Sequence, residues 1–381
     1  MPTMEGPTVT LVGDDLEKTG GYFGGVLAPK ETKVYAIPLQ SSLVLCIDPA
    51  LDTAALVGDD LGREKGQWFG GVFAPSCNKI FSPPLNASRV LCIDPATDAV
   101  TLVGDDLGSD GDKWFHGALA LNGSIYGSPF NASKVLCIDP TSGNSTLVGD
   151  DLGSDTAKWS GGVLAPSGLI FFIPFNASKV LCVDPALGTT KLVSDDLGSD
   201  GAKWSGGVLA PDGKKIFCIP RNASKVLCID AATGTAKLVG DDLGGSSGKW
   251  AGGVLAPDGK IYSPPLNASR VLCIDPATDT VSLVGEDLAS GGGKYFGCVL
   301  APNGKIISIP LNANKLLSIT TPIPENWSLD ATALPVLSAS AVGVSSDMLD
   351  KTPSAPATAP AAAEESPFDK MLGFFSNRAG A

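Results

Sequence analysis

The sequence is poor in histidine, in basic residues and in long apolar runs, and each shortage excludes a class of function. Its 27 Lys and Arg face 40 Asp and Glu, a net charge of −13. A phosphate backbone would be repelled, so we expect no nucleic-acid partner. No apolar run approaches the roughly 18 residues typical of a transmembrane span. Residues 1–15 lack the basic start and apolar stretch of a secretory signal. We therefore expect a cytoplasmic protein, or a secreted one if the true N-terminus is missing.

Motifs for catalysis and for cofactors are scarce as well. No glycine-rich dinucleotide or phosphate-binding pattern occurs, and the acidic pairs lack the alternating spacing of a calcium loop. His116 is the only histidine, and no nucleophile can be identified for it to activate. We expect no cofactor and no metal, and a catalytic role is disfavoured.

What the sequence does contain is a repeat. Leu-Val-Gly-Asp-Asp or a near-copy recurs every 45 or 46 residues, beginning at Leu11, Leu56, Leu102, Leu147, Leu192, Leu238 and Leu283. A fixed period of this size is typical of propellers and solenoids. In the unit spanning residues 250–285, turn residues separate four short β-forming runs. This pattern predicts a four-stranded antiparallel blade of a β-propeller.

The ends of the repeat region predict how the ring closes. The last unit, beginning at Tyr295, supplies three strands, because the Pro-rich residues 320–324 break a fourth. The chain begins with an unpaired fourth strand at residues 8–13, which would complete that blade and remove an open edge. We predict an all-β, seven-bladed β-propeller over residues 1–321. Residues 322–381 read as an Ala/Pro/Ser-rich linker and a short helix.

Two repeated stretches resemble those of known propeller families. The glycine pairs, such as Gly161-Gly162, are similar to those of kelch repeats, although here they follow an aromatic residue in the first strand. The stretch Val-Leu-Cys-Ile-Asp-Pro-Ala-Thr resembles YVTN-type and quinoprotein-type repeats, whereas the Trp-Asp dipeptide of WD40 repeats is absent. The chain thus resembles β-propeller repeat proteins without matching one subfamily, and the resemblance implies that fold.

Cysteines and asparagines recur at fixed repeat positions. Six of the nine cysteines share one position in the third strand: Cys46, Cys92, Cys137, Cys182, Cys228 and Cys273. Equivalent positions on neighbouring blades are too far apart to bridge, so we expect free thiols, which favour a reducing compartment. Asn-Ala-Ser begins at Asn86, Asn131, Asn176, Asn222 and Asn267. Each is either a turn asparagine or, in a secreted chain, a glycosylation site.

The loops of one face carry the residues with most chemistry. In a meander the Asn-Ala-Ser turns share a face with the interblade connections, which hold the acidic pairs and mostly end in Lys-aromatic. The candidate binding residues at this channel mouth are Trp68, Trp114, Trp159, Trp204, Trp250, Tyr295, Lys113, Lys158, Lys203, Lys249, Lys294 and His116. Such a ring suits a cation, a sugar or a peptide. The structural alternative is that the first Asp of each pair caps its loop and each Trp packs between blades.

A further candidate lies near the C-terminus. Ser366-Pro367-Phe368-Asp369 has the composition of a helix start, and the apolar residues Phe368, Met371, Leu372 and Phe375 then share one helical face. We predict a helix over residues 367–378 that docks on another protein; folding back onto its own propeller is the alternative.

Together these patterns favour a non-catalytic binding or scaffold propeller whose partner is another protein. The first alternative is a secreted or surface carbohydrate-binding propeller that uses the aromatic residues as stacking platforms. The second is a metal-dependent enzyme with a site at the channel mouth.

Overall fold

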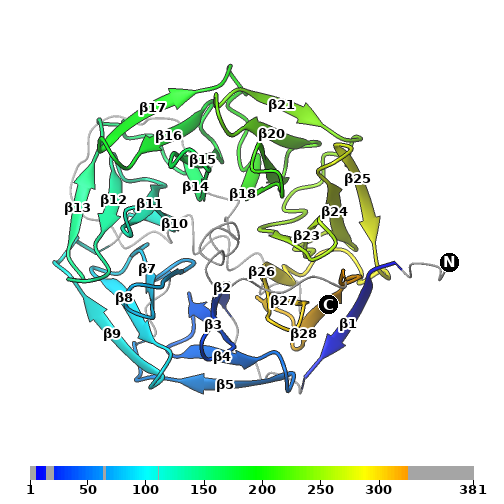
Figure 1. The fold of residues 1–381 in the computed structure, drawn as a ribbon, viewed down its shortest axis with the longest axis horizontal. Coiled ribbons are helices and arrows are strands. Elements are labelled where there is room, and N and C mark those ends of the chain that lie inside the picture. The colour runs from blue at the N-terminus through cyan, green and yellow to red at the C-terminus, as the bar shows by residue number, and fades with distance from the viewer. Residues whose placement is uncertain (1–5, 14–20, 63–65, 110, 325–381) are drawn as a thin grey trace, which may run out of the picture.

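The computed structural model describes residues 6–13, 21–62, 66–109 and 111–324 as a ring of seven four-stranded antiparallel sheets. In six blades the four strands follow one another outward from the central axis in chain order, and in the seventh the N-terminal strand is outermost (Figure 1). The predicted seven-bladed propeller is confirmed. Within the described ranges there is no helix of the length and apolar character required to cross a membrane.

The strand bounds repeat closely from blade to blade, and blades are numbered here from the one that begins at Tyr22. The innermost strands of blades 1–7 are β2 (Tyr22–Ala28), β6 (Val72–Ala74), β10 (Trp114–Leu119), β14 (Trp159–Leu164), β18 (Trp204–Leu209), β22 (Val254–Leu255) and β26 (Tyr295–Leu300). The second strands are β3 (Lys33–Pro38), β7 (Lys79–Ser82), β11 (Ile125–Pro129), β15 (Ile170–Pro174), β19 (Lys215–Pro220), β23 (Ile261–Ser263) and β27 (Lys305–Pro310). The third strands are β4 (Val44–Asp48), β8 (Val90–Asp94), β12 (Val135–Ile138), β16 (Val180–Asp184), β20 (Val226–Asp230), β24 (Val271–Asp275) and β28 (Leu316–Thr320). The outermost strands are β5 (Thr53–Val57), β9 (Ala99–Val103), β13 (Ser145–Val148), β17 (Thr189–Val193), β21 (Ala236–Val239), β25 (Thr280–Val284) and, for blade 7, β1 (Thr8–Val12).

The N-terminal strand closes the ring. β1 pairs antiparallel with β28, with Thr8 opposite Thr320 and Val12 opposite Leu316. Gly13 follows the strand with a φ of +80°, so the strand ends one residue before the predicted bound. First and last segments of the propeller therefore share one sheet, which confirms the predicted closure.

The two glycines of the repeated pair in the innermost strand have different structural roles. The first glycine sits at a β-bulge and has a positive φ, +73° at Gly161, a conformation that costs glycine little. The second lies against the neighbouring blade. A Cβ on Gly207 would come within 2.9 Å of Ile173 Cδ1 of blade 4. The pair thus permits both the bulge and the close approach of successive blades.

Double prolines shorten the inner strands of two blades. Blades 2 and 6 carry Pro83-Pro84 and Pro264-Pro265, and their innermost strands have three and two residues. Proline has no backbone N–H to donate to the sheet, so pairing there is reduced to isolated bridges such as Trp250 with Pro265. The first strand predicted at residues 250–256 is for this reason limited to Val254–Leu255.

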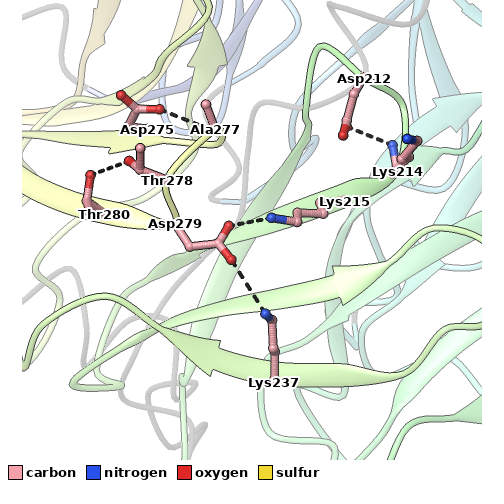
Figure 2. A network of polar contacts seen from close by, with 9 residues as sticks. All are labelled: Asp212, Lys214, Lys215, Lys237, Asp275, Ala277, Thr278, Asp279 and Thr280. Carbon is pink, nitrogen blue, oxygen red and sulfur yellow. Dashed lines mark hydrogen bonds and ion pairs between the residues drawn. The ribbon is translucent and has the colours of Figure 1, made fainter.

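On the face opposite the interblade connections, ion pairs join blades. Lys215 of blade 5 contacts Asp279 of blade 6 at 2.7 Å, and Lys237 approaches the other carboxylate oxygen at 3.5 Å (Figure 2). Equivalent pairs are Lys33–Asp98 at 3.7 Å and Lys305–Asp52 at 2.9 Å. The three aspartates occupy a turn position with φ of +53° to +57°; blades 3–5 have Gly143, Gly188 and Gly234 at that position.

The core consists of apolar clusters between successive blades and one cluster on the axis. All nine cysteines are free, as expected: six are buried, and Cys77, Cys137 and Cys182 are half-buried.

Candidate functional site

The aromatic side chains that precede or begin each first strand lie between blades. Trp204, for example, belongs to the cluster formed by blades 4 and 5. The side-chain N–H of each of the five tryptophans at this position donates a hydrogen bond of 2.8–2.9 Å to the carbonyl just before the third strand of its own blade, as Trp250 Nε1 does to Arg270. The candidate aromatic residues are only 2–4% exposed: Trp68, Trp114, Trp159, Trp204, Trp250 and Tyr295. A ligand could stack on these rings only by displacing the contacts between blades.

The lysine before each of these aromatic residues is held by backbone carbonyls. Lys158 Nζ donates to the carbonyls of Asn131, Gly153 and Asp155 at 3.2, 3.4 and 2.6 Å. Each of the five lysines donates to at least one carbonyl in the Asn-Ala-Ser turn of the preceding blade. These lysines are Lys113, Lys158, Lys203, Lys249 and Lys294. Burial lowers the pKa of Lys158, Lys203 and Lys249 to about 8. These ammonium groups connect blades and lie mostly out of reach of solvent.

The Asn-Ala-Ser asparagine joins the same contact. Asn176 Oδ1 accepts a hydrogen bond of 2.8 Å from the backbone N–H of Ala202, which has a φ of +53°. Its Nδ2 donates to the carbonyl of Thr156 at 3.2 Å. The Oδ1 contact spans 26 residues at each of Asn86, Asn131, Asn176, Asn222 and Asn267. We call these contacts of the asparagine side chain the asparagine clamp. We did not predict it from the sequence, although the constant separation between Asn-Ala-Ser and the following Lys-aromatic was an available signal.

The two residues of each acidic pair have different roles. The second aspartate caps the connection: Asp106 Oδ1 accepts from Gly108 N at 2.8 Å, and five other blades repeat the bond. The prediction that the first aspartate makes this cap was wrong, because the turn brings the second carboxylate, and not the first, to the amide two residues further on. The first acid of each described pair is exposed.

His116, in an innermost strand beside the central axis, interrupts the sevenfold repeat. It occupies the position that glycine holds in the other six blades, with a φ of +47°. The backbone N–H of His116 donates to the carbonyl oxygen of Phe69 at 3.0 Å. The imidazole ring lies so close to Gly70 that a Cβ on Gly70 would collide with Cδ2 of His116. The side chain is buried, Nδ1 has no hydrogen-bond partner among the described residues, and burial lowers the pKa to about 4.

Around the axis two rings of side chains form a central cluster. One ring comes from the innermost strands or, for Phe69, from the residues just before one, and contains Phe23, Phe69, Phe115 and Phe296. Phe69 lies 3.9 Å from Phe115 and 5.7 Å from Phe296 between ring centroids. The other ring follows the second strands and consists of Leu39, Leu85, Phe130, Phe175, Leu266 and Leu311, with Arg221 at the blade 5 position. The repeat pattern alone did not lead us to predict that Arg221 lies on the axis.

One apolar feature is exposed in every blade. The leucine of the Leu-Val-Gly-Asp-Asp repeat is 44–55% exposed on the outermost strand: Leu11, Leu56, Leu102, Leu147, Leu192, Leu238 and Leu283. These strands form the perimeter of the ring (Figure 1). We call the seven side chains the perimeter leucines. The residue before this leucine varies among Thr, Ala, Lys and Ser, whereas the leucine and the valine that follows it are the same in all seven repeats.

Other candidate sites are not assembled in the described part of the chain. No group of three or more His, Cys, Asp or Glu side chains there is arranged to hold a metal ion. The predicted docking residues Phe368, Met371, Leu372 and Phe375 lie outside the described residues, so the helix and its linker stay a prediction.

Known structures share the fold at low sequence identity. The chain is similar to a streptogramin B lyase, with a TM-score of 0.66 and 12% identity over 83% of this chain and 98% of that one. A catalytically inactive virginiamycin B lyase from Staphylococcus aureus with quinupristin gives 0.67 and 11% over 83% and 100%. Hydrazine synthase from Kuenenia stuttgartiensis gives 0.61 and 16% over 83% and 99%. No protein-family profile and no curated protein sequence matches the chain. These likenesses establish the propeller fold alone.

Proposed function

We propose that this protein is a non-catalytic binding propeller that holds another protein along the outer strands of its blades. The observation that carries the proposal is the ring of seven perimeter leucines, each 44–55% exposed. A single exposed leucine is ordinary, whereas seven around one perimeter offer a partner that spans several blades a series of apolar contacts. Cross-strand pairing explains part of the pattern, because Leu102 lies opposite the buried Leu91. It does not explain why the half-exposed partner is leucine in all seven blades.

The backbone and charge of the same surface define the partner. Each outermost strand pairs only with the third strand of its blade among the described residues. Its outward edge can therefore accept an added strand, with side-chain contacts giving specificity. Next to each perimeter leucine of blades 1–6 stands an exposed acidic pair, such as Asp105-Asp106 beside Leu102. The complementary partner is an extended segment with apolar side chains flanked by lysine or arginine.

The burial of the connection face also favours this surface over the stacking alternative. Carbohydrate recognition through the aromatic residues requires exposed ring faces, and those rings are almost fully buried between blades. The lysines of the same face donate to carbonyls of the connections. The repeated residues that remain open to a partner are the perimeter leucines and the acids beside them.

Substitution of perimeter leucines tests the proposal. In the test variant, Leu147→Ser, Leu192→Ser and Leu238→Ser alter three adjacent blades. In the matched control, Leu51→Ser, Leu121→Ser and Leu187→Ser alter leucines of the opposite face, of which Leu51 is 71% exposed and Leu121 and Leu187 are 73% exposed. We expect both variants to melt within a few degrees of the wild type. Cross-linking capture from native extract should lose its partner only in the first variant; equal capture by both variants would contradict the proposal.

A further inference from the structure

Blade 5 replaces both members of the central cluster with polar residues. Blades 7, 1, 2 and 3 have phenylalanine at the inner-strand position, and every blade except blade 5 has leucine or phenylalanine at the second position. Blade 5 has Ser205 and Arg221 there, and both side chains are almost fully buried. The neighbouring inner-strand positions are Ser160 and Ala251. The axis is therefore aromatic on the side of blades 7, 1, 2 and 3, and polar and cationic on the side of blade 5.

We infer from the repeat that these two side chains are neighbours. In blade 3 the equivalent residues are Phe115 and Phe130, whose ring centroids lie 4.2 Å apart. Around the second ring, Phe130 lies 5.6 Å from Phe175, and the guanidinium carbon of Arg221 lies 5.7 Å from the centroid of Phe175. Arg221 thus continues the ring of side chains around the axis and stacks on an aromatic face, an arrangement favourable to a guanidinium.

The serine adds an independent sign of a ligand. Ser205 is completely buried, and its Oγ has no hydrogen-bond partner among the described residues. By contrast, the hydroxyl of Ser160 donates to Trp204 O at 3.3 Å. A buried hydroxyl without a partner is costly and rare in folded proteins. The position of Ser205 corresponds to that of the phenylalanines that point into the central cluster, so its hydroxyl faces the axis.

We propose that Arg221 and Ser205 form a binding site for a carboxylate attached to an apolar body. A guanidinium presents two parallel N–H groups that match the two oxygens of a carboxylate. The Ser205 hydroxyl supplies a further donor to the same group. The phenylalanines across the axis, among them Phe69 and Phe296, provide an apolar surface for the rest of the molecule. This site is separate from the perimeter leucines and does not depend on the function proposed for them.

Fluorine NMR with a matched pair of probes tests the site in the full chain. The probes are 4-(trifluoromethyl)benzoate and its neutral amide, which share one apolar body. We expect line broadening and a shift for the benzoate, with binding at least tenfold tighter than that of the amide. Arg221→Leu introduces the residue that four other blades have at this position, so the variant should fold, and it should lose at least tenfold in benzoate affinity. The control Arg89→Gln, which removes an exposed guanidinium, should bind as the wild type does.

Two sources of the carboxylate are distinguished by a further variant. Acidic residues of the chain itself, among them Glu364, Glu365 and Asp369, could occupy the site in place of a free acid. If so, Glu364→Gln, Glu365→Gln and Asp369→Asn together should raise benzoate affinity at least tenfold, and Arg221→Leu should abolish the gain. Any one of three results would overturn the proposal. The first is equal binding of benzoate and amide, and the second is equal benzoate binding by the Arg221→Leu variant and the wild type. The third is no benzoate binding either with or without the acidic residues.

Discussion

Lys215 Nζ and Asp279 Oδ1 lie 2.7 Å apart across the boundary between blades 5 and 6 (Figure 2). The hydrogen bond from Lys215 lowers the pKa of Asp279, and the same bond raises that of Lys215. Both groups are partly exposed, with side-chain exposures of 32% and 24%, so the pair contributes modestly to stability. The aspartate also has a φ of +56°, where blades 3–5 have glycine.

Substitutions at Asp279 should separate the ion pair from the backbone conformation. Asp279→Gly removes the carboxylate but suits the positive φ, so we expect a loss of at most about 1 kcal/mol. Asp279→Ala removes the carboxylate and places alanine at that φ, which should cost about 1 kcal/mol more. Urea unfolding of both variants, with Lys215→Met for a double-mutant cycle, measures these differences. A glycine variant less stable than the alanine variant would contradict this account of the turn.

His116 should make the propeller sensitive to acid. Burial lowers its pKa in the folded protein to about 4, from the ordinary histidine value of 6.5. Its contribution to stability is therefore fully present above pH 6.5 and lost as the pH falls through about 4. The difference corresponds to a stability change on the order of 3 kcal/mol. The His116→Gly variant has the residue of the other six blades at this position. Between pH 7 and pH 4 its unfolding free energy should fall by less than that of the wild type, and the difference between the two losses should equal the contribution of His116. Parallel acid losses in variant and wild type would refute the buried neutral histidine, whose single imidazole resonance can also be titrated by NMR.

The Asn-Ala-Ser turns allow a structural role to be separated from glycosylation. Asn176→Ala removes the acceptor of the Ala202 N–H bond and leaves that amide without its partner, which should cost about 1–2 kcal/mol. Ser178→Ala destroys the same sequon but keeps the asparagine, so its unfolding free energy should match that of the wild type. Equal destabilisation by the two changes, or a lower apparent mass for both when the chain is expressed in a secretory pathway, would favour a glycan over the clamp.

The sequence specifies the outer half of each blade better than the inner half. The strand expected at residues 280–284 is found as Thr280–Val284, because turn residues and β-branched residues mark it locally. The inner strand expected at residues 250–256 is shorter in the structure, since its partner contains Pro264-Pro265. Pairing across strands, which no local pattern contains, decided the difference.

The candidate site shows the same limit. Repetition identified the Trp and Lys positions of the connection face, and packing of each Trp between blades was one of its two interpretations. The structure shows that packing for Trp204, and it also shows that Lys158 is surrounded by carbonyls, which the repeat did not predict. The perimeter leucines were visible in the repeat from the start. Their exposure was not, because an apolar residue in a β-forming run is ordinarily expected to be buried.

The thiols should respond to both unfolding and alkali. In native protein at neutral pH we expect at most three reactive cysteines, the half-buried Cys77, Cys137 and Cys182, and nine after denaturation. Burial raises the pKa of Cys182 and Cys228 to about 11, from 9.0. Their contribution to stability is therefore complete below pH 9 and lost as the pH rises through about 11. Thiol titration with and without denaturant measures the number of reactive cysteines, and unfolding free energies measured between pH 8 and pH 11 check the alkaline loss of stability. Fewer than nine thiols in denaturant, restored to nine by reductant, would reveal disulfides.

Binding of a partner along the outer strands is tested most directly by hydrogen–deuterium exchange of the full chain, alone and in its captured complex. The outward amides of the outermost strands have no strand partner in the described part of the chain, so in the free protein they should exchange quickly. The proposed function predicts that the complex slows exchange in strands such as β17 and β21 and at the acidic pairs that follow them. Slowed exchange confined to the Lys-aromatic connections, with the outermost strands unchanged, would contradict it.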